Sequence, residues 1–74
     1  MESYKNLSGL SGVRAYEIGP HHIRIQFKGP KIYTYSTRLN SSGTIEHMKE
    51  LAVSGQGLGT FINKNSDVRE SFDE

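Results

Sequence analysis

The sequence predicts an α+β domain in which a three-stranded antiparallel meander packs against one helix, with a short second helix after it (β-β-β-α-α). Two patterns carry this prediction: a strict alternation of polar and apolar residues over 22–28, and an apolar stripe at three- and four-residue steps further along the chain. The stripe consists of Ile45, Met48, Leu51 and Ala52. The chain has 74 residues, which is the size of one domain.

Three strands are expected, at residues 13–18, 22–28 and 31–36. Gly19-Pro20 ends the first strand and Gly29-Pro30 ends the second, because these residue pairs mark turns. The connections are short, so neighbouring strands should run antiparallel.

The alternation in the second strand separates an apolar face from a polar face. The apolar face carries Ile23, Ile25 and Phe27, and the polar face carries His22, Arg24, Gln26 and Lys28. Tyr33 and Tyr35 share one face of the third strand, and a bulge near Gly29 could turn them to either side of the sheet. We expect them to pack with the apolar face, with their hydroxyl groups at its rim.

A polar connector leads into the helix, for which Thr44 is the expected N-cap. The helix should end near Gly55, and residues 55–59 should form a glycine-rich turn. Residues 60–65 should add one short helical turn that docks back on the core.

The two ends of the chain differ from its middle in composition. Residues 1–12 are polar and rich in serine and glycine, which predicts a flexible arm. Residues 66–74 predict a frayed acidic tail, which leaves residues 13–65 as the domain.

The composition also limits the compartment and the chemistry. The chain has no cysteine, so it can form no disulfide and no thiolate metal site. No stretch approaches the ~18 apolar residues that a membrane span needs. The N-terminus lacks the basic start and apolar run of a signal peptide. We therefore expect a cytoplasmic protein without membrane contact and without a cofactor.

The net charge of +1 hides an uneven distribution. From Asp67 onwards four acids oppose one base, whereas the rest of the chain carries eight bases and four acids, a net charge of +4. The densest basic stretch is 14–38. This asymmetry predicts an anionic partner, which the acidic tail could shield. An ordinary solvated sheet face is the alternative.

The first candidate binding site is the polar strand face together with the turn beside it. Its predicted ligand-binding residues are His22, Arg24, Gln26, Lys28, Lys31 and Tyr35. Basic side chains on a sheet can contact phosphates and tyrosines can stack on bases, so a nucleic acid or a nucleotide is the expected partner. If the tyrosines belong to the core, the stacking platform is lost, and solvated strands carry polar residues in any case.

The glycine-rich turn is the second candidate. Glycine lets the backbone approach a phosphate closely and a helix start offers N–H donors, so Gln56, Gly57 and Thr60 are predicted to contact the ligand. The turn matches neither the dinucleotide-binding fingerprint nor the P-loop. A helix end followed by a tight turn requires the same glycines.

Metal binding and catalysis have little support. His21 and His22 should point to opposite faces of a strand, and His47 with Glu50 lacks a third protein ligand. Glu46 and Glu50 lie one turn apart on an exposed helix, where nothing buries either carboxyl group. We therefore expect no metal site, no catalytic residue and no enzymatic activity.

Between residues 13 and 65 the sequence also follows a family pattern: a tyrosine strand, an alternating strand ending in phenylalanine, a Tyr-x-Tyr strand, and a helix ending in small residues before a Phe-Asn turn. The residues concerned are Tyr16, Ile23, Ile25, Phe27, Tyr33, Tyr35, 52–55, Gly59, Phe61 and Asn63. In these positions the chain resembles the KTSC domain, which occurs alone in bacteria and phages and at the C-terminus of some lysyl-tRNA synthetases. Here the connector 37–43 is longer than the family's and lacks its proline. The resemblance implies contact with RNA or nucleotides, by analogy with the synthetases.

Two classes of function follow. The first is a non-enzymatic module that binds a phosphate-bearing ligand: RNA, single-stranded DNA, or a nucleotide that it sequesters, in which case a homo-oligomer would be needed to enclose the ligand. The second is a protein–protein interaction module, such as a small phage or bacterial regulator of a host protein. It would use a sheet edge or an apolar patch around Leu7, Leu10 and Ile32.

Overall fold

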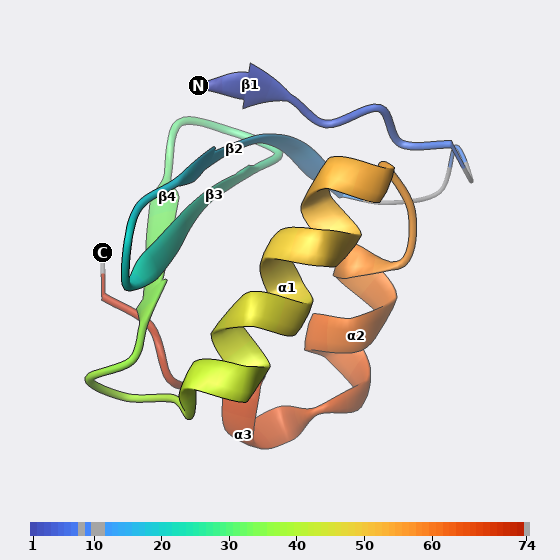
Figure 1. The fold of residues 1–74 in the computed structure, drawn as a ribbon. Helices are drawn as coiled ribbons and strands as arrows, with labels where there is room; N and C mark the ends of the chain where they lie inside the picture. Colours follow the sequence, from blue (N-terminus) through green and yellow to red (C-terminus); the bar gives the residue numbers. More distant parts are fainter. Residues whose placement is uncertain (8, 10–11, 74) are drawn as a thin grey trace.

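The computed structural model describes residues 1–7, 9 and 12–73 of the chain. Within these residues the elements are β1 (Glu2–Ser3), β2 (Val13–Ile18), β3 (His22–Phe27), β4 (Ile32–Ser36), α1 (Ser42–Ser54), α2 (Leu58–Lys64) and α3 (Ser66–Arg69). The strands form one antiparallel sheet in the order β1-β2-β3-β4, and the helices lie against one face of it (Figure 1). The predicted α+β class and antiparallel order are confirmed, while the described chain has one strand and one helix more than predicted.

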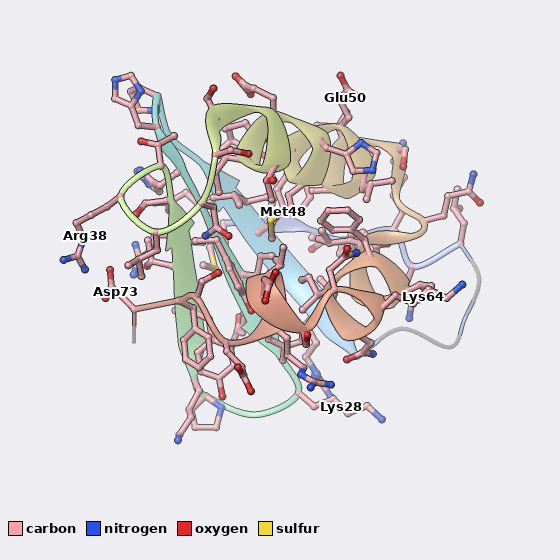
Figure 2. All side chains as sticks on the ribbon, turned by 90° about the horizontal axis from the view of Figure 1, so that it is seen from below. Lys28, Arg38, Met48, Glu50, Lys64 and Asp73 are labelled. Carbon is pink, nitrogen blue, oxygen red and sulfur yellow. The ribbon has the colours of Figure 1, made fainter. Side chains whose placement is uncertain are left out.

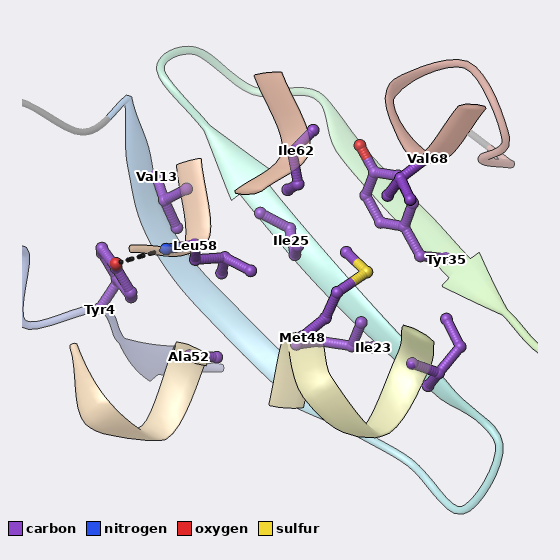
Figure 3. Close-up of a cluster of buried hydrophobic side chains, with 11 residues drawn as sticks. Tyr4, Val13, Ile23, Ile25, Tyr35, Met48, Ala52, Leu58, Ile62 and Val68 are labelled. Atoms are coloured by element: carbon purple, nitrogen blue, oxygen red, sulfur yellow. Dashed lines mark hydrogen bonds between the residues drawn. The ribbon is translucent and has the colours of Figure 1, made fainter. Parts of the chain in front are cut away.

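The core lies between β3, β4 and the helices (Figure 3). Ile23 and Ile25 of β3 are completely buried, and Met48 of α1 and Leu58 of α2 are buried against them. The predicted apolar stripe of α1 therefore does face the sheet, as its three- and four-residue spacing requires.

The strand register decides the position of the two tyrosines. Ile23 pairs with Tyr35 and Ile25 pairs with Tyr33, and directly paired residues of an antiparallel sheet share a face. Both tyrosines consequently lie on the core face, as predicted, and Tyr35 is only 1% exposed.

The N-terminal segment differs from the predicted loose arm. Glu2 and Ser3 pair with Tyr16 and Ala15 of β2, which adds β1 to the sheet. Tyr4 follows and is buried in the core, where its hydroxyl group accepts a hydrogen bond from the backbone N–H of Leu58 (3.3 Å; Figure 3). No sequence pattern predicts this contact, because a single aromatic residue among polar ones has no periodicity.

The C-terminal segment also differs from the predicted frayed tail. Val68 of α3 is buried, and the ring of Phe72 lies 4.3 Å from that of Tyr33 between centroids. Asp73 then runs along β4: its carbonyl accepts from the N–H of Thr34 (2.6 Å), and its N–H donates to the carbonyl of Thr34 (2.9 Å). This contact covers part of an outer strand whose backbone groups would otherwise meet water or another chain.

The start of α1 lies slightly before the predicted one. Ser41, not Thr44, is the N-cap, and its side chain accepts the N–H of Thr44 (3.2 Å). Ser41 serves because it precedes the helix with an extended backbone, whereas Thr44 is already inside the first turn. The helix ends before Gly55, as predicted.

Burial of Tyr35 predicts a loss of stability at alkaline pH. Burial, and to a lesser degree the neighbouring Tyr33, raise the pKa of Tyr35 to about 12. An unfolded chain would release this proton near pH ~10, so the native state retains a proton that the unfolded state has lost. The stabilisation is therefore fully present below pH ~10 and is lost as the pH rises towards about 12.

This prediction can be measured by urea unfolding of the wild-type protein and the Tyr35→Phe variant across that pH range. The free energy of unfolding of the wild type should fall more steeply with pH than that of the variant, because only the wild type has this phenol to ionise. Parallel curves would show that the Tyr35 phenol ionises as easily in the native state as in the unfolded chain.

Candidate functional site

The structure divides the basic side chains into those with and those without a carboxylate partner. The ion pairs are Arg24 with Glu17 (3.4 Å), Arg38 with Asp73 (2.6 Å) and Lys49 with Glu46 (3.4 Å). In the described part of the chain, Arg14 and Lys28 have no such partner. An anion would therefore meet more uncompensated charge at Arg14 and Lys28 than at Arg24.

The polar face of β3 lies open, opposite the helices, but its side chains are engaged within the sheet. Arg24 pairs across the strands with Glu17, and the amide nitrogen of Gln26 donates to the carbonyl of Gly29 (3.2 Å). The ring of His22 lies so close to Gly19 that a Cβ added there would meet it at 2.0 Å. These three side chains are held by contacts within the two hairpins, so fewer of their polar groups are free to bind a ligand.

Arg14 and Lys28 instead meet at the other end of the same strands. They line a shallow hollow of ≈ 360 Å³ together with Tyr4, Asn6, Gly12 and Val13. The register between β2 and β3 shifts between Val13 and Ala15, so Arg14 occupies a bulge there. Such an irregularity re-aims a side chain relative to the regular strand. The hollow thus combines two cations with the first residues of the chain.

Of the residues that line this hollow, the sequence predicts Lys28 as ligand-binding but not Arg14, Tyr4 or Asn6. Arg14 belonged to the basic stretch that the sequence does show, but the bulge depends on cross-strand pairing. Tyr4 and Asn6 belong to the predicted arm, and only the folded chain brings them beside β2.

Of the other two predicted residues of this region, one is accessible and one is not. Lys31 is exposed in the turn between β3 and β4. Tyr35 lies in the core, on the opposite face of the sheet from Arg24, and cannot contact a ligand there. Bases therefore cannot stack on Tyr33 or Tyr35 at the open face, because these side chains point to the other side of the sheet from Arg24.

The glycine-rich turn serves first as a helix end. Gly55 has φ +82° and Gly57 has φ +85°, a left-handed region that favours glycine, and the N–H of Gly55 closes α1 on the carbonyls of Leu51 and Ala52. The hydroxyl of Ser54 accepts the N–H of Gln56 (3.4 Å), and Tyr4 accepts that of Leu58. Two backbone donors of the turn are thus already used within the protein.

The N-terminal segment covers this turn. The N–H of Leu7 donates to the carbonyl of Gly55 (2.8 Å), and the side chain of Lys5 lies over the same glycine. Gln56, Gly57 and Thr60 remain exposed, but none of them lines the hollow of Arg14 and Lys28. The two predicted halves of the site are therefore not brought together in that hollow.

The apolar patch proposed for a protein partner is not a single surface. Leu7 follows β1 at one edge of the sheet, whereas Ile32 belongs to β4 at the other edge. Leu10 lies outside the described residues.

Neither a metal-binding cluster nor a membrane-spanning helix occurs among the described residues. The described residues contain no group of three or more histidine, aspartate or glutamate side chains placed to hold a metal ion. His47 packs edge-on against the ring of Phe61, with centroids 4.8 Å apart. None of the helices described is both long and apolar enough to cross a bilayer.

Comparisons with protein families, with curated proteins and with solved structures found no match to this chain. The resemblance to the KTSC domain accordingly stays a prediction.

Gly55 and Gly43 form a matched pair for testing the turn. Gly55→Ala should destabilise the protein by about 1–3 kcal/mol, because it places a Cβ at positive φ. The new Cβ would also lie 2.6 Å from Cβ of Lys5. Gly43, in the first turn of α1, has no atom within 4 Å of an added Cβ, so Gly43→Ala should be neutral or stabilising by up to about 1 kcal/mol. Urea unfolding measures both, and equal effects would contradict the close packing of the arm on the turn.

Proposed function

We propose that this protein is a non-enzymatic module that binds a phosphate-bearing ligand, with the phosphate seated between Arg14 and Lys28. The observation that carries the proposal is the hollow in which these two cations lie without carboxylate partners among the described residues. The other predicted cation of β3, Arg24, has its charge partly compensated by Glu17.

The side chains around the hollow suit a phosphate. An arginine guanidinium can bind two phosphate oxygens at once, and a lysine ammonium adds a strong point charge. Tyr4 also lines the hollow, but its hydroxyl group is buried beside α2, where it accepts from the N–H of Leu58, so the contact with the phosphate depends on the two cations. Lys31, which is exposed between β3 and β4, does not line the hollow.

The position of the tyrosines favours binding through phosphates over binding through bases. With Tyr33 and Tyr35 on the core face, β3 and β4 present no tyrosine ring on their open side on which a base could stack. RNA, single-stranded DNA and a free nucleotide all present phosphates, so the ligands are separated by experiment. An RNA ligand would agree with the resemblance to the KTSC domain.

The test compares Arg14→Gln and Lys28→Gln with Lys64→Gln as the control. Lys64 is an exposed lysine of α2 that does not line the hollow and lies apart from Lys28 (Figure 2). Fluorescence anisotropy would measure binding of labelled single-stranded RNA and DNA, and thermal shift would measure binding of nucleotides. Each variant of the hollow should lose at least about tenfold in affinity, because a hydrogen bond to a charged group contributes roughly 1.5–3 kcal/mol.

Salt dependence then distinguishes the ligands. If RNA or single-stranded DNA binds, the logarithm of the affinity should fall linearly with that of the salt concentration, and each lost cation should lower the slope by about 1. A nucleotide should depend less on salt. Absence of binding to any of these ligands at low salt, or an equal loss in the Lys64→Gln variant, would refute the proposal.

A further inference from the structure

Away from the hollow of Arg14 and Lys28, exposed apolar side chains gather on one surface. Met1, Ile18 and Val53 are 50%, 44% and 56% exposed. Val53 lines two shallow hollows, of ≈ 610 and ≈ 400 Å³, and Met1 and Ile18 line the second of them. We call this region, between α1 and the β1–β2 edge of the sheet, the Val53 surface. Side chains of this kind are normal when scattered singly, whereas apolar patches with a polar rim are typical of interaction sites when they are contiguous and large.

Carboxylates surround these apolar side chains. Glu46 and Glu50 of α1 line the first hollow, and Glu2 and Glu17 line the second. Glu50 lies on the opposite side of the molecule from Lys28 (Figure 2).

Two of the four carboxylates have their charge compensated within the protein. Lys49 pairs with Glu46 and also donates to the carbonyl of Pro20 (3.3 Å), and Arg24 pairs with Glu17. For Glu2 and Glu50 the described chain offers no ion-pair partner. The Val53 surface therefore presents an apolar centre flanked by two carboxylates that have no ion-pair partner among the described residues. The cations that line the same hollows are Lys49 and the α-ammonium of Met1, so the four carboxylates outnumber them.

These charges decide which kind of occupant fits. A second copy of the chain, placed symmetrically on the Val53 surface, would bring the same glutamates towards each other, because a two-fold interface uses the same patch on both subunits. Like charges brought together across an interface are unfavourable. An occupant with positive charges beside an apolar side chain meets the opposite sign at Glu2 and Glu50 and covers Val53 and Ile18.

We infer that the Val53 surface binds a basic amphipathic segment of another protein, with an apolar side chain of that segment against Val53 and Ile18 and its lysines or arginines beside Glu2 and Glu50. The apolar contact supplies affinity, and the charges supply orientation and specificity. This site uses none of the residues of the hollow of Arg14 and Lys28, so it stands or falls independently of phosphate binding.

The probe is a labelled peptide of repeated Leu-Lys-Lys-Leu units, and its counterpart carries glutamate in place of every lysine. Binding is measured by fluorescence anisotropy, and the contact is mapped by amide chemical-shift changes of the full chain. The lysine peptide should shift the amides of Ile18, Glu50 and Val53, and the glutamate peptide should not bind.

Two substitutions of the Val53 surface are compared with two matched controls. Val53→Lys and Glu50→Lys should each weaken binding at least about tenfold, as expected for a central contact and its charge. Leu39→Lys and Glu70→Lys make the same kinds of change at exposed residues that line neither hollow, and they should leave the affinity within about twofold, since surface changes away from a contact have small effects. All four positions are exposed, and the melting temperature of each variant confirms folding.

Three results would overturn the inference. The first is unchanged affinity in folded Val53→Lys and Glu50→Lys, and the second is equal binding of the glutamate peptide. The third is a concentration-dependent dimer of the wild type, seen by sedimentation and abolished by Val53→Lys, which would make a second copy the occupant.

Discussion

The contact between the apolar face of β3–β4 and the helices is the constraint on which the rest of this structure depends. Ile23, Ile25 and Tyr35 lie side by side on that face, and Met48 closes over them from α1. Because the cross-strand pairing puts Tyr35 beside Ile23, the largest side chain of the sheet centre is used for packing. What remains on the other face is polar, with Arg24 and Gln26 tied to neighbouring residues.

A chain of this length has few apolar residues with which to complete such a core. Small domains bury a smaller fraction of their surface than large ones do, so each buried side chain contributes a larger share of the stabilising burial. The protein meets this need with both ends of the chain. Tyr4 enters the core beside α2, and Phe72 packs on Tyr33 while Asp73 covers Thr34 at the sheet edge. Ordering the ends therefore completes the core and also covers part of an outer strand.

The same arrangement positions the two candidate binding surfaces. Pairing of β1 with β2 brings the N-terminal residues beside the bulge of Arg14, where Lys28 of the neighbouring strand end completes the hollow. At the other end of β2, Ile18 lines a hollow together with Met1 and Val53, and Glu2 and Glu17 line the same hollow. The two surfaces thus differ in the charges that lack ion-pair partners among the described residues: cations at the hollow of Arg14 and Lys28, and carboxylates at the Val53 surface.

By itself, the sequence determined the strands β2, β3 and β4, the core stripe of α1 and the end of that helix at Gly55, because these depend on local alternation, helical spacing and glycine at positive φ. It also pointed to Lys28 as a candidate ligand-binding residue. Only the tertiary structure decided that Arg14 joins Lys28, that Tyr4 and Phe72 belong to the core, and that Tyr35 is unavailable to a ligand. The physical reason is the same in each case: a bulge, a docked chain end and a cross-strand pair are contacts between residues distant in sequence, and no local periodicity encodes them.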